Sequence, residues 1–125
     1  MPLQASILVV DDDPATRTLL GHILAAHGYL VIEAAHGRQA LERLDGVTPD
    51  AILLDLAMPV MDGFEFLRLH RAHPQRGAIP VIVLSGVPPQ DQRCVEMPSV
   101  RFVAKPFTED QVIAAIHAEC GHLTA

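Results

Sequence analysis

Four consecutive apolar residues in the middle of the chain, Ala51–Leu54, end at an aspartate, Asp55. A short apolar run bounded by turn residues is typical of a strand that is buried on both faces of a parallel sheet. A charge at the carboxyl end of such a strand costs free energy unless it is solvated, paired or bound to metal. Ligands of open α/β sheets bind just outside that end of the strands. The position of Asp55 therefore predicts a functional site.

The rest of the chain alternates short apolar runs with amphipathic segments. Strands are predicted at residues 6–10, 29–33, 51–54, 81–84 and 100–104, and helices at 14–28, 38–44, 62–72, 90–96 and 108–120. Asp13-Pro14 and Thr108-x-x-Gln111 are start signals for the first and last helices. Five strands that alternate with five helices predict a doubly wound parallel α/β sheet. A length of 125 residues predicts a single domain, with its core over about residues 6–120.

The charge balance and the cysteines limit the classes of partner. Nine Lys and Arg residues against fifteen Asp and Glu residues give a net charge of −6, which argues against direct nucleic-acid binding. No apolar stretch approaches the ~20 residues that cross a bilayer, and no signal peptide is apparent. We therefore expect no membrane contact and a cytoplasmic location. Cys94 and Cys120 form no metal-ligand pattern and are expected to be reduced thiols.

Right-handed crossovers place the carboxyl ends of all the predicted strands at one edge of the sheet. That edge gathers polar residues from four strands: Asp11, Asp12 and Asp13 after the first, Asp55 after the third, Ser85 after the fourth and Lys105 after the fifth. Carboxylates brought together repel one another, and a hard cation such as Mg2+ relieves the repulsion while keeping room for a phosphate oxygen. Asp13, before Pro14, is better explained as a helix cap. Taken singly, the other side chains could be solvated turn or surface residues.

In combination, these residues resemble the motif of the receiver domain (CheY-like) of bacterial two-component response regulators. The residues that carry the resemblance are Asp11-Asp12, Asp55-x-x-Met58-Pro59-x-x-Asp62-Gly63, Ser85 and Lys105-Pro106-Phe107. The resemblance implies a flavodoxin-like sheet with strand order 2-1-3-4-5. It implies that Asp55 is the phospho-acceptor, and that Mg2+ is bound by Asp11, Asp12, Asp55 and the backbone carbonyl of Ala57. It also implies that Ser85 and Lys105 bind the phosphoryl group, that Phe102 turns inward as Ser85 moves, and that the peptide bond before Pro106 is cis.

The function implied by the resemblance is a phosphorylation-activated signalling switch. A histidine kinase or a histidine phosphotransfer protein would donate a phosphoryl group to Asp55. The face formed by the fourth and fifth strands and the last helix would then change shape and bind a downstream protein effector. Such a domain takes part in its own phosphorylation and dephosphorylation and is otherwise no enzyme. A phosphorylation-linked homodimer is one possible form of the output. The alternative is that the chain is the receiver part of a hybrid kinase or of a DNA-binding regulator.

Two other classes of function fit less well. A Mg-dependent aspartyl phosphatase of the haloacid dehalogenase type uses similar chemistry. However, Asp55-Leu56-Ala57 lacks the second aspartate of that motif, and 125 residues leave no room for a cap domain. A phosphorylation-independent interaction module would not need the full set of carboxylates together with Ser85 and Lys105.

The segment between Ser85 and Lys105 departs from the family pattern. It spans 20 residues, which is short for this family, and it contains three prolines, at 88, 89 and 98. Because proline interrupts helices, the fourth helix, over residues 90–96, is expected to be short or irregular.

Two side chains that would flank the phosphate, Ala57 and Val87, are apolar and cannot orient an attacking water molecule. Slow autodephosphorylation is therefore expected.

His70 and His73 lie one turn apart on a predicted helix, but no third metal ligand is apparent, so both are expected to be exposed helix residues.

Overall fold

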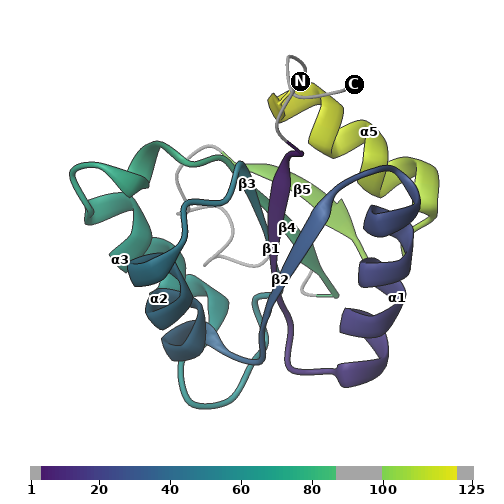
Figure 1. The fold of residues 1–125 in the computed structure, drawn as a ribbon. Helices are drawn as coiled ribbons and strands as arrows, with labels where there is room; N and C mark the ends of the chain where they lie inside the picture. Colours follow the sequence, from purple (N-terminus) through teal and green to yellow (C-terminus); the bar gives the residue numbers. More distant parts are fainter. Residues whose placement is uncertain (1–3, 87–99, 121–125) are drawn as a thin grey trace.

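Five parallel strands form a single sheet in the computed structural model, which describes residues 4–86 and 100–120 (Figure 1). The strands are β1 (Ser6–Val10), β2 (Leu30–Ala34), β3 (Ala51–Leu54), β4 (Val81–Ser85) and β5 (Arg101–Ala104). Their order across the sheet is β2-β1-β3-β4-β5, and every neighbouring pair is parallel. The predicted fold class and strand order are confirmed.

Helices cover both faces of this sheet. They are α1 (Pro14–Ala26), α2 (Gly37–Gly46), α3 (Gly63–Ala72) and α5 (Glu109–Cys120), with a 3-10 turn, η1 (Arg76–Ala78), before β4. Figure 1 shows α1 and α5 on one face and α2 and α3 on the other. The predicted fourth helix, at residues 90–96, lies outside the described residues.

Alternate residues of the central strands point into two separate cores, as the two-residue period of a strand requires. Leu53 joins the core under α1 and α5, whereas Ile52 and Leu54 join the core under α2 and α3. All four residues of β3 are at most 1% exposed. The prediction of a strand buried on both faces is therefore confirmed, and Asp55 follows it directly.

The start signals of the first and last helices act as predicted. Asp13 Oδ1 accepts a hydrogen bond from the Ala15 N–H at 3.2 Å, and Pro14 is the first residue of α1. At α5, the Thr108 N–H donates to Gln111 Oε1 at 2.8 Å, and the Gln111 N–H donates to Thr108 Oγ1 at 3.2 Å. This reciprocal pair is a capping box.

The second strand begins one residue later than predicted, at Leu30 instead of Tyr29. The reason is the end of α1, where Gly28 adopts a φ of +86° that favours glycine. The Tyr29 N–H then donates back to the Leu24 carbonyl at 3.0 Å, so the first sheet bond of this segment comes from the Leu30 N–H to the Ala5 carbonyl, at 2.8 Å.

Helix α2 begins at Gly37, one residue before the predicted start. His36 caps it, because its Nδ1 accepts a hydrogen bond from the Gln39 N–H at 3.2 Å. Gln39 Oε1 in turn accepts from the Ala35 N–H at 2.6 Å. Histidine is an uncommon cap, which is why the sequence pattern did not reveal this helix start.

The prediction that His70 is an exposed helix residue is wrong. His70 is 0% exposed, its ring stacks on Phe66 with centroids 5.7 Å apart, and its Nε2 lies 3.1 Å from the Ile79 carbonyl oxygen. It lies one turn beyond the buried pair Phe66 and Leu67, so the helical period places it on the core face of α3. His73 is half-buried just after α3, and its Nδ1 accepts hydrogen bonds from the N–H groups of Gln75 and Arg76 at the start of the η1 turn.

Cys120 is a buried free thiol at the end of α5, and its Sγ donates to the Asp50 carbonyl at 3.5 Å. Cys94 lies outside the described residues. Within the described part of the chain, no helix combines the length and the apolar character needed to cross a membrane.

Candidate functional site

The carboxyl ends of four strands meet at one edge of the sheet, and the backbone pairing continues one residue past them. The Asp11 N–H donates to the Ala34 carbonyl at 3.1 Å, and the Asp55 N–H donates to the Val10 carbonyl at 2.9 Å. On the other side of β4, the Lys105 N–H donates to the Ser85 carbonyl at 2.9 Å. The sheet itself therefore holds the backbone of these residues in register.

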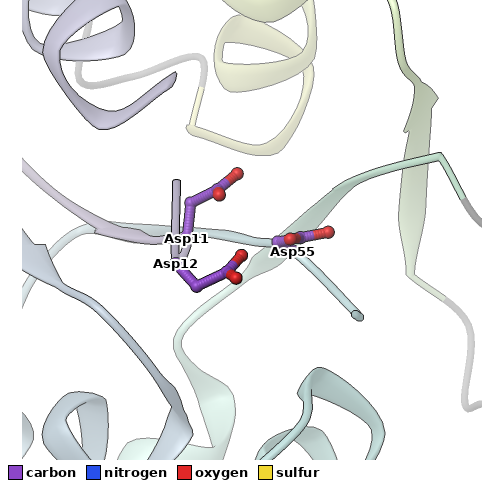
Figure 2. Close-up of side chains that lie close together, drawn as sticks. All are labelled: Asp11, Asp12 and Asp55. Atoms are coloured by element: carbon purple, nitrogen blue, oxygen red, sulfur yellow. The ribbon is translucent and has the colours of Figure 1, made fainter. Parts of the chain in front are cut away.

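Three carboxylates gather at this edge. Asp11, Asp12 and Asp55 each place an oxygen within 4.8 Å of the others (Figure 2). Asp11 and Asp55 are 2% and 6% exposed, whereas Asp12 is open to solvent. They form the one such group of three or more potential metal ligands among residues 4–86 and 100–120. Two buried carboxylates and one exposed carboxylate give a hard oxygen site that is accessible from solution.

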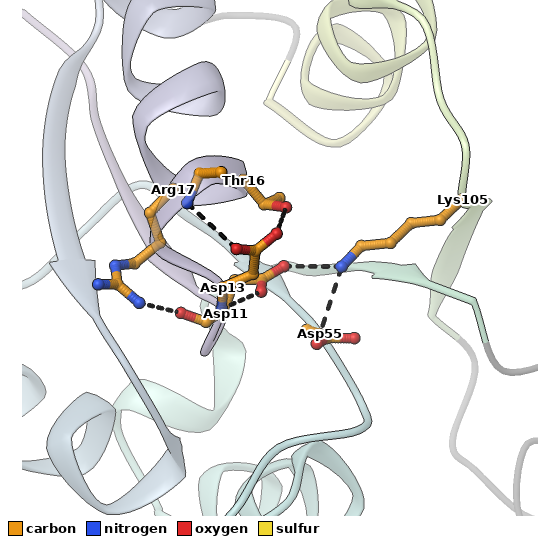
Figure 3. Close-up of polar contacts among 7 residues, drawn as sticks. Asp11, Asp13, Thr16, Arg17, Asp55 and Lys105 are labelled. Carbon is orange, nitrogen blue, oxygen red and sulfur yellow. Dashed lines mark hydrogen bonds and ion pairs between the residues drawn. The ribbon is translucent and has the colours of Figure 1, made fainter.

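Lys105 projects from the end of β5 into the same cluster. Its Nζ lies 2.8 Å from Asp11 Oδ2 and 3.7 Å from Asp55 Oδ2 (Figure 3). The ammonium group thus pairs more closely with Asp11 than with Asp55. The peptide bond between Lys105 and Pro106 is cis.

The surroundings of Asp55 disfavour its charge. Burial, followed by the negative charge of Asp11, raises the pKa of the Asp55 carboxyl, and the Lys105 ammonium only partly opposes this. The Ala57 N–H also donates a hydrogen bond to Asp55 and lowers its pKa. A divalent cation held among the three carboxylates would supply the missing positive charge, and Mg2+ favours such oxygen ligands. The residues present therefore fit a magnesium site.

The other residues that the sequence pointed to lie around this cluster. Ser85 is buried at the end of β4, and Phe102, opposite Val83 in β5, is half-buried against the core under α2 and α3. Ala57 is exposed and lines an open cleft of about 380 Å3 beside the cluster, together with Asp12, Leu56, Met58, Pro59, Asp62 and Phe64. Asp13 does not join the carboxylates, because both of its oxygens cap α1.

The backbone of α3 approaches the end of β3 closely. The Gly63 N–H donates to the Leu56 carbonyl at 2.8 Å. A Cβ atom at Gly63 would lie 2.6 Å from Leu56 Cα and would also meet the Asp55 carbonyl oxygen. Only glycine allows this approach, so Gly63 fixes where Asp55 and the following loop lie relative to α3.

Sequence reasoning missed Arg17 as part of this region. From α1, its Nη1 donates to the Asp11 carbonyl at 2.7 Å (Figure 3). Its Nε lies 3.3 Å from Glu33 Oε1. A backbone oxygen six residues away leaves no signal in residue types or spacing. The position of Arg17 in the first turn of the helix that follows Asp11–Asp13 is the only hint that the sequence offers.

The comparisons with known proteins agree with this geometry. The family model for the response regulator receiver domain matches residues 7–117. The chain is 41% identical over 106 residues to a protein-glutamate methylesterase/protein-glutamine glutaminase of Treponema denticola, covering 80% of this chain but 28% of that protein. It is 32% identical over 114 residues to sporulation initiation phosphotransferase F of Bacillus subtilis, covering 91% and 92% of the two chains.

A solved structure with the same fold also carries a metal. It is the receiver domain of a sensor histidine kinase from Pseudomonas aeruginosa, solved with a magnesium ion coordinated in its active-site cleft. The TM-score is 0.87 at 30% identity, and the match covers 95% of this chain and 99% of that one. The matched family model, the sheet order and the cluster of Asp11, Asp12 and Asp55 together place this chain in the family of response regulator receiver domains.

Proposed function

We propose that this chain is a phosphorylation-activated switch in which Asp55 accepts a phosphoryl group from the phosphohistidine of a histidine kinase or a histidine phosphotransfer protein. The observation that carries the proposal is the buried carboxylate of Asp55 at the end of β3, grouped with Asp11 and Asp12 and 3.7 Å from Lys105. Membership of the receiver family supports the same assignment.

The chemistry asks little of the protein beyond position and charge. A carboxylate oxygen of Asp55 forms a bond to phosphorus while the phosphorus–nitrogen bond of the donor imidazole breaks, and the imidazole leaves with the electron pair. Asp11, Asp12, Asp55 and the Ala57 carbonyl would hold Mg2+, which supplies positive charge to the phosphoryl oxygens when bound. Lys105 supplies a second positive charge from the side of β5.

The signal would leave the site through β4 and β5. The acyl phosphate adds about −1.5 to −2 charge at Asp55. Ser85 and Lys105 bind its oxygens in this proposal, and Phe102 moves inward into the space beside Ser85. The face made by β4, β5 and α5 thereby changes shape and binds a downstream protein effector, with a phosphorylated homodimer as one form that the output can take.

The output of the whole protein is a separate part of the proposal. The chain spans about a quarter of the length of the methylesterase relative that it matches, and nearly all of sporulation initiation phosphotransferase F. Receiver domains thus occur both inside longer proteins and nearly alone. We propose a protein effector as the output and no chemical turnover beyond the phosphoryl group on Asp55.

The test is phosphoryl uptake from a small phosphodonor in the presence of Mg2+, measured by intact mass. We expect the wild type to gain the mass of one phosphoryl group, which alkali removes as it does from an acyl phosphate, and Asp55→Asn to gain none. The matched control is Asp13→Asn, which removes a neighbouring carboxylate but keeps a good helix cap. It should take up the group like the wild type. Equal uptake by Asp55→Asn, or none by the wild type, would refute the proposal.

A further inference from the structure

Arg17 ties the loop after β1 to the neighbouring strand β2. Its side chain is only 20% exposed, although it comes from a surface helix. Its Nη1 donates to the Asp11 carbonyl at 2.7 Å, a short distance for such a bond (Figure 3). Its Nε pairs with Glu33 on β2 at 3.3 Å. A long, flexible side chain is thus held at both ends of its guanidinium group.

The carbonyl that Arg17 binds belongs to the peptide group between Asp11 and Asp12. Asp11 is held at its other polar atoms as well: its N–H by Ala34, one carboxylate oxygen by the Asp13 N–H at 2.9 Å and the other by Lys105. Asp12 differs. Within residues 4–86 and 100–120, no hydrogen bond or ion pair holds its carboxylate, and it is exposed. The direction of the Asp12 side chain therefore depends on the two peptides that flank it: Asp11 Oδ1 holds the following one through the Asp13 N–H, and Arg17 holds the preceding one.

We propose that Arg17, anchored by Glu33, is a positioning residue that fixes the Asp11–Asp12 peptide and so aims the Asp12 carboxylate at the magnesium site. The inference deepens the proposed function, because it concerns the same cation site. Arg17 itself touches neither metal nor phosphate. Its role is to reduce the number of backbone conformations that Asp12 samples before the ion binds.

The charge of Arg17 gives the proposal a test with a definite sign. A positive side chain near the site repels a divalent cation, so removing its charge should tighten Mg2+ binding if electrostatics alone matter. If Arg17 positions Asp12, removing it should weaken Mg2+ binding instead. Loss of a group that orients metal ligands typically costs 10–100-fold in metal affinity.

The experiment is calorimetric titration of Mg2+ into the wild type, Arg17→Met and Arg17→Gln at constant ionic strength. We expect the dissociation constant to rise about tenfold in both variants. Arg17→Lys, which keeps the charge and one donor, should recover part of the affinity. The matched control is Arg68→Met, which removes an exposed arginine that pairs with Glu65 on α3, and which should leave the affinity unchanged.

A separate readout removes the effect of overall stability. Thermal unfolding in chelator reports whether each variant is folded, and if Arg17→Met is not, Arg17→Gln decides the question. In phosphoryl uptake from a small donor, the Mg2+ concentration for half-maximal rate should rise, whereas the rate at saturating Mg2+ should approach that of the wild type. A merely structural role would lower the saturated rate as well.

Several outcomes would overturn the inference. These are Mg2+ binding by the folded Arg17 variants that is equal to or tighter than wild type, equal weakening in Arg68→Met, and a wild type that binds no Mg2+. The proposed function fails separately: a wild type that binds Mg2+ but takes up no phosphoryl group refutes that function, while the ratio of affinities still decides the role of Arg17.

Discussion

The carboxylate of Asp55 lies beside those of Asp11 and Asp12, and the Lys105 ammonium group is 3.7 Å from Asp55 Oδ2. Burial and the negative charges of Asp11 and Asp12 raise the pKa of Asp55 more than Lys105 lowers it, so in the absence of a cation the charge of Asp55 opposes folding. The same arrangement makes the site receptive to positive charge. What costs stability without the metal therefore favours binding of the metal.

Asp55→Asn should raise the stability of the metal-free protein at neutral pH. The substitution removes a buried charge next to Asp11 and keeps the size of the side chain, so we expect a gain on the order of 1 kcal/mol. Thermal or urea unfolding in chelator measures it. Asp110→Asn, at an exposed position in the first turn of α5, is the control and should lose slightly instead. A less stable Asp55→Asn protein would contradict this description of the site.

His70 should make stability depend on pH. Burial, with the nearby charges of Arg71, Arg76 and His73, lowers the pKa of His70 below the ordinary 6.5. The Nε2–H donates to the Ile79 carbonyl, and Nδ1 is buried with no partner among the described residues, so a second proton would find no acceptor. Below pH 6.5 the unfolded chain binds a proton that the folded chain does not, and stability therefore falls as the pH falls towards the folded pKa.

His70→Gln removes this titration while keeping a donor for Ile79. We expect its stability to change less than that of the wild type between pH 7.5 and 5.5, about one unit either side of the ordinary histidine value. Unfolding midpoints across that range test it. His22→Gln, on the exposed side of α1, serves as the matched substitution. Identical pH slopes for the wild type and His70→Gln would show that another group is responsible.

Ala57 should make the phosphorylated state long-lived. It lines the cleft beside the three carboxylates and has no polar side-chain atom that could orient a water molecule for attack on the acyl phosphate. Val87, the second residue expected to flank the phosphate, lies outside the described residues. We expect phospho-Asp55 to persist well beyond seconds, and Ala57→Asn to shorten its lifetime several-fold, followed by intact mass over time. Ala118→Asn, exposed on α5, should not shorten it. A wild-type lifetime of seconds would exclude this explanation.

Among the helices and strands, the site depends on how closely the starts of α3 and α1 approach the ends of β3 and β1. Helix α3 begins at Gly63, directly against the backbone of Asp55 and Leu56, and Asp62 caps it by accepting the Glu65 N–H at 2.9 Å. Helix α1 begins at Pro14, beside Asp11 and Asp12, under its own aspartate cap. Both caps hold their helices at fixed positions relative to the strand ends. The carboxylates thus sit between two helix starts whose positions the sequence specifies.

Gly63→Ala should be costly because its Cβ would meet backbone atoms, which cannot turn aside as a side chain can. We expect a loss of about 1–3 kcal/mol in urea unfolding, the range for overpacked sites, together with slower phosphoryl uptake. Gly21→Ala is the matched control. It lies inside α1, nothing is within 4 Å of its added Cβ, and it should gain up to about 1 kcal/mol from better helix propensity. A Gly63→Ala protein as stable as the wild type would mean that α3 can shift freely.

The parallel topology of the whole chain explains why the strands and the gathering of the site residues could be predicted from the sequence. Apolar periodicity located the five strands to within a residue or so, and the right-handed crossover rule brought Asp11, Asp55 and Lys105 to one edge. Local signals predicted the helix starts at Asp13 and Thr108, because there the cap and its partner are close in sequence.

What the sequence could not reveal depends on backbone atoms from distant segments. The polar ring of His70 can stay buried because the Ile79 carbonyl, beyond the η1 turn, accepts a hydrogen bond from its Nε2–H. Arg17 joins the site through the Asp11 carbonyl and Glu33. Every residue has a carbonyl, so such partners leave no pattern in residue types. The ion pair between Lys105 and Asp11 likewise follows from the exact spacing of β1 and β5, which sit on opposite sides of β3 and β4.

The buried thiol of Cys120 offers an experimental use of the fold itself. Burial raises the pKa of Cys120, and its Sγ faces the Asp50 carbonyl beside the start of β3. A thiol reagent can therefore reach it only when the end of α5 separates from the sheet. In a Cys94→Ser background, the rate of thiol labelling would measure how often α5 lifts from β3. Comparing that rate before and after phosphoryl uptake would report, without any added probe, whether a charge at the carboxyl end of β3 changes how often α5 separates from the other end of the strand.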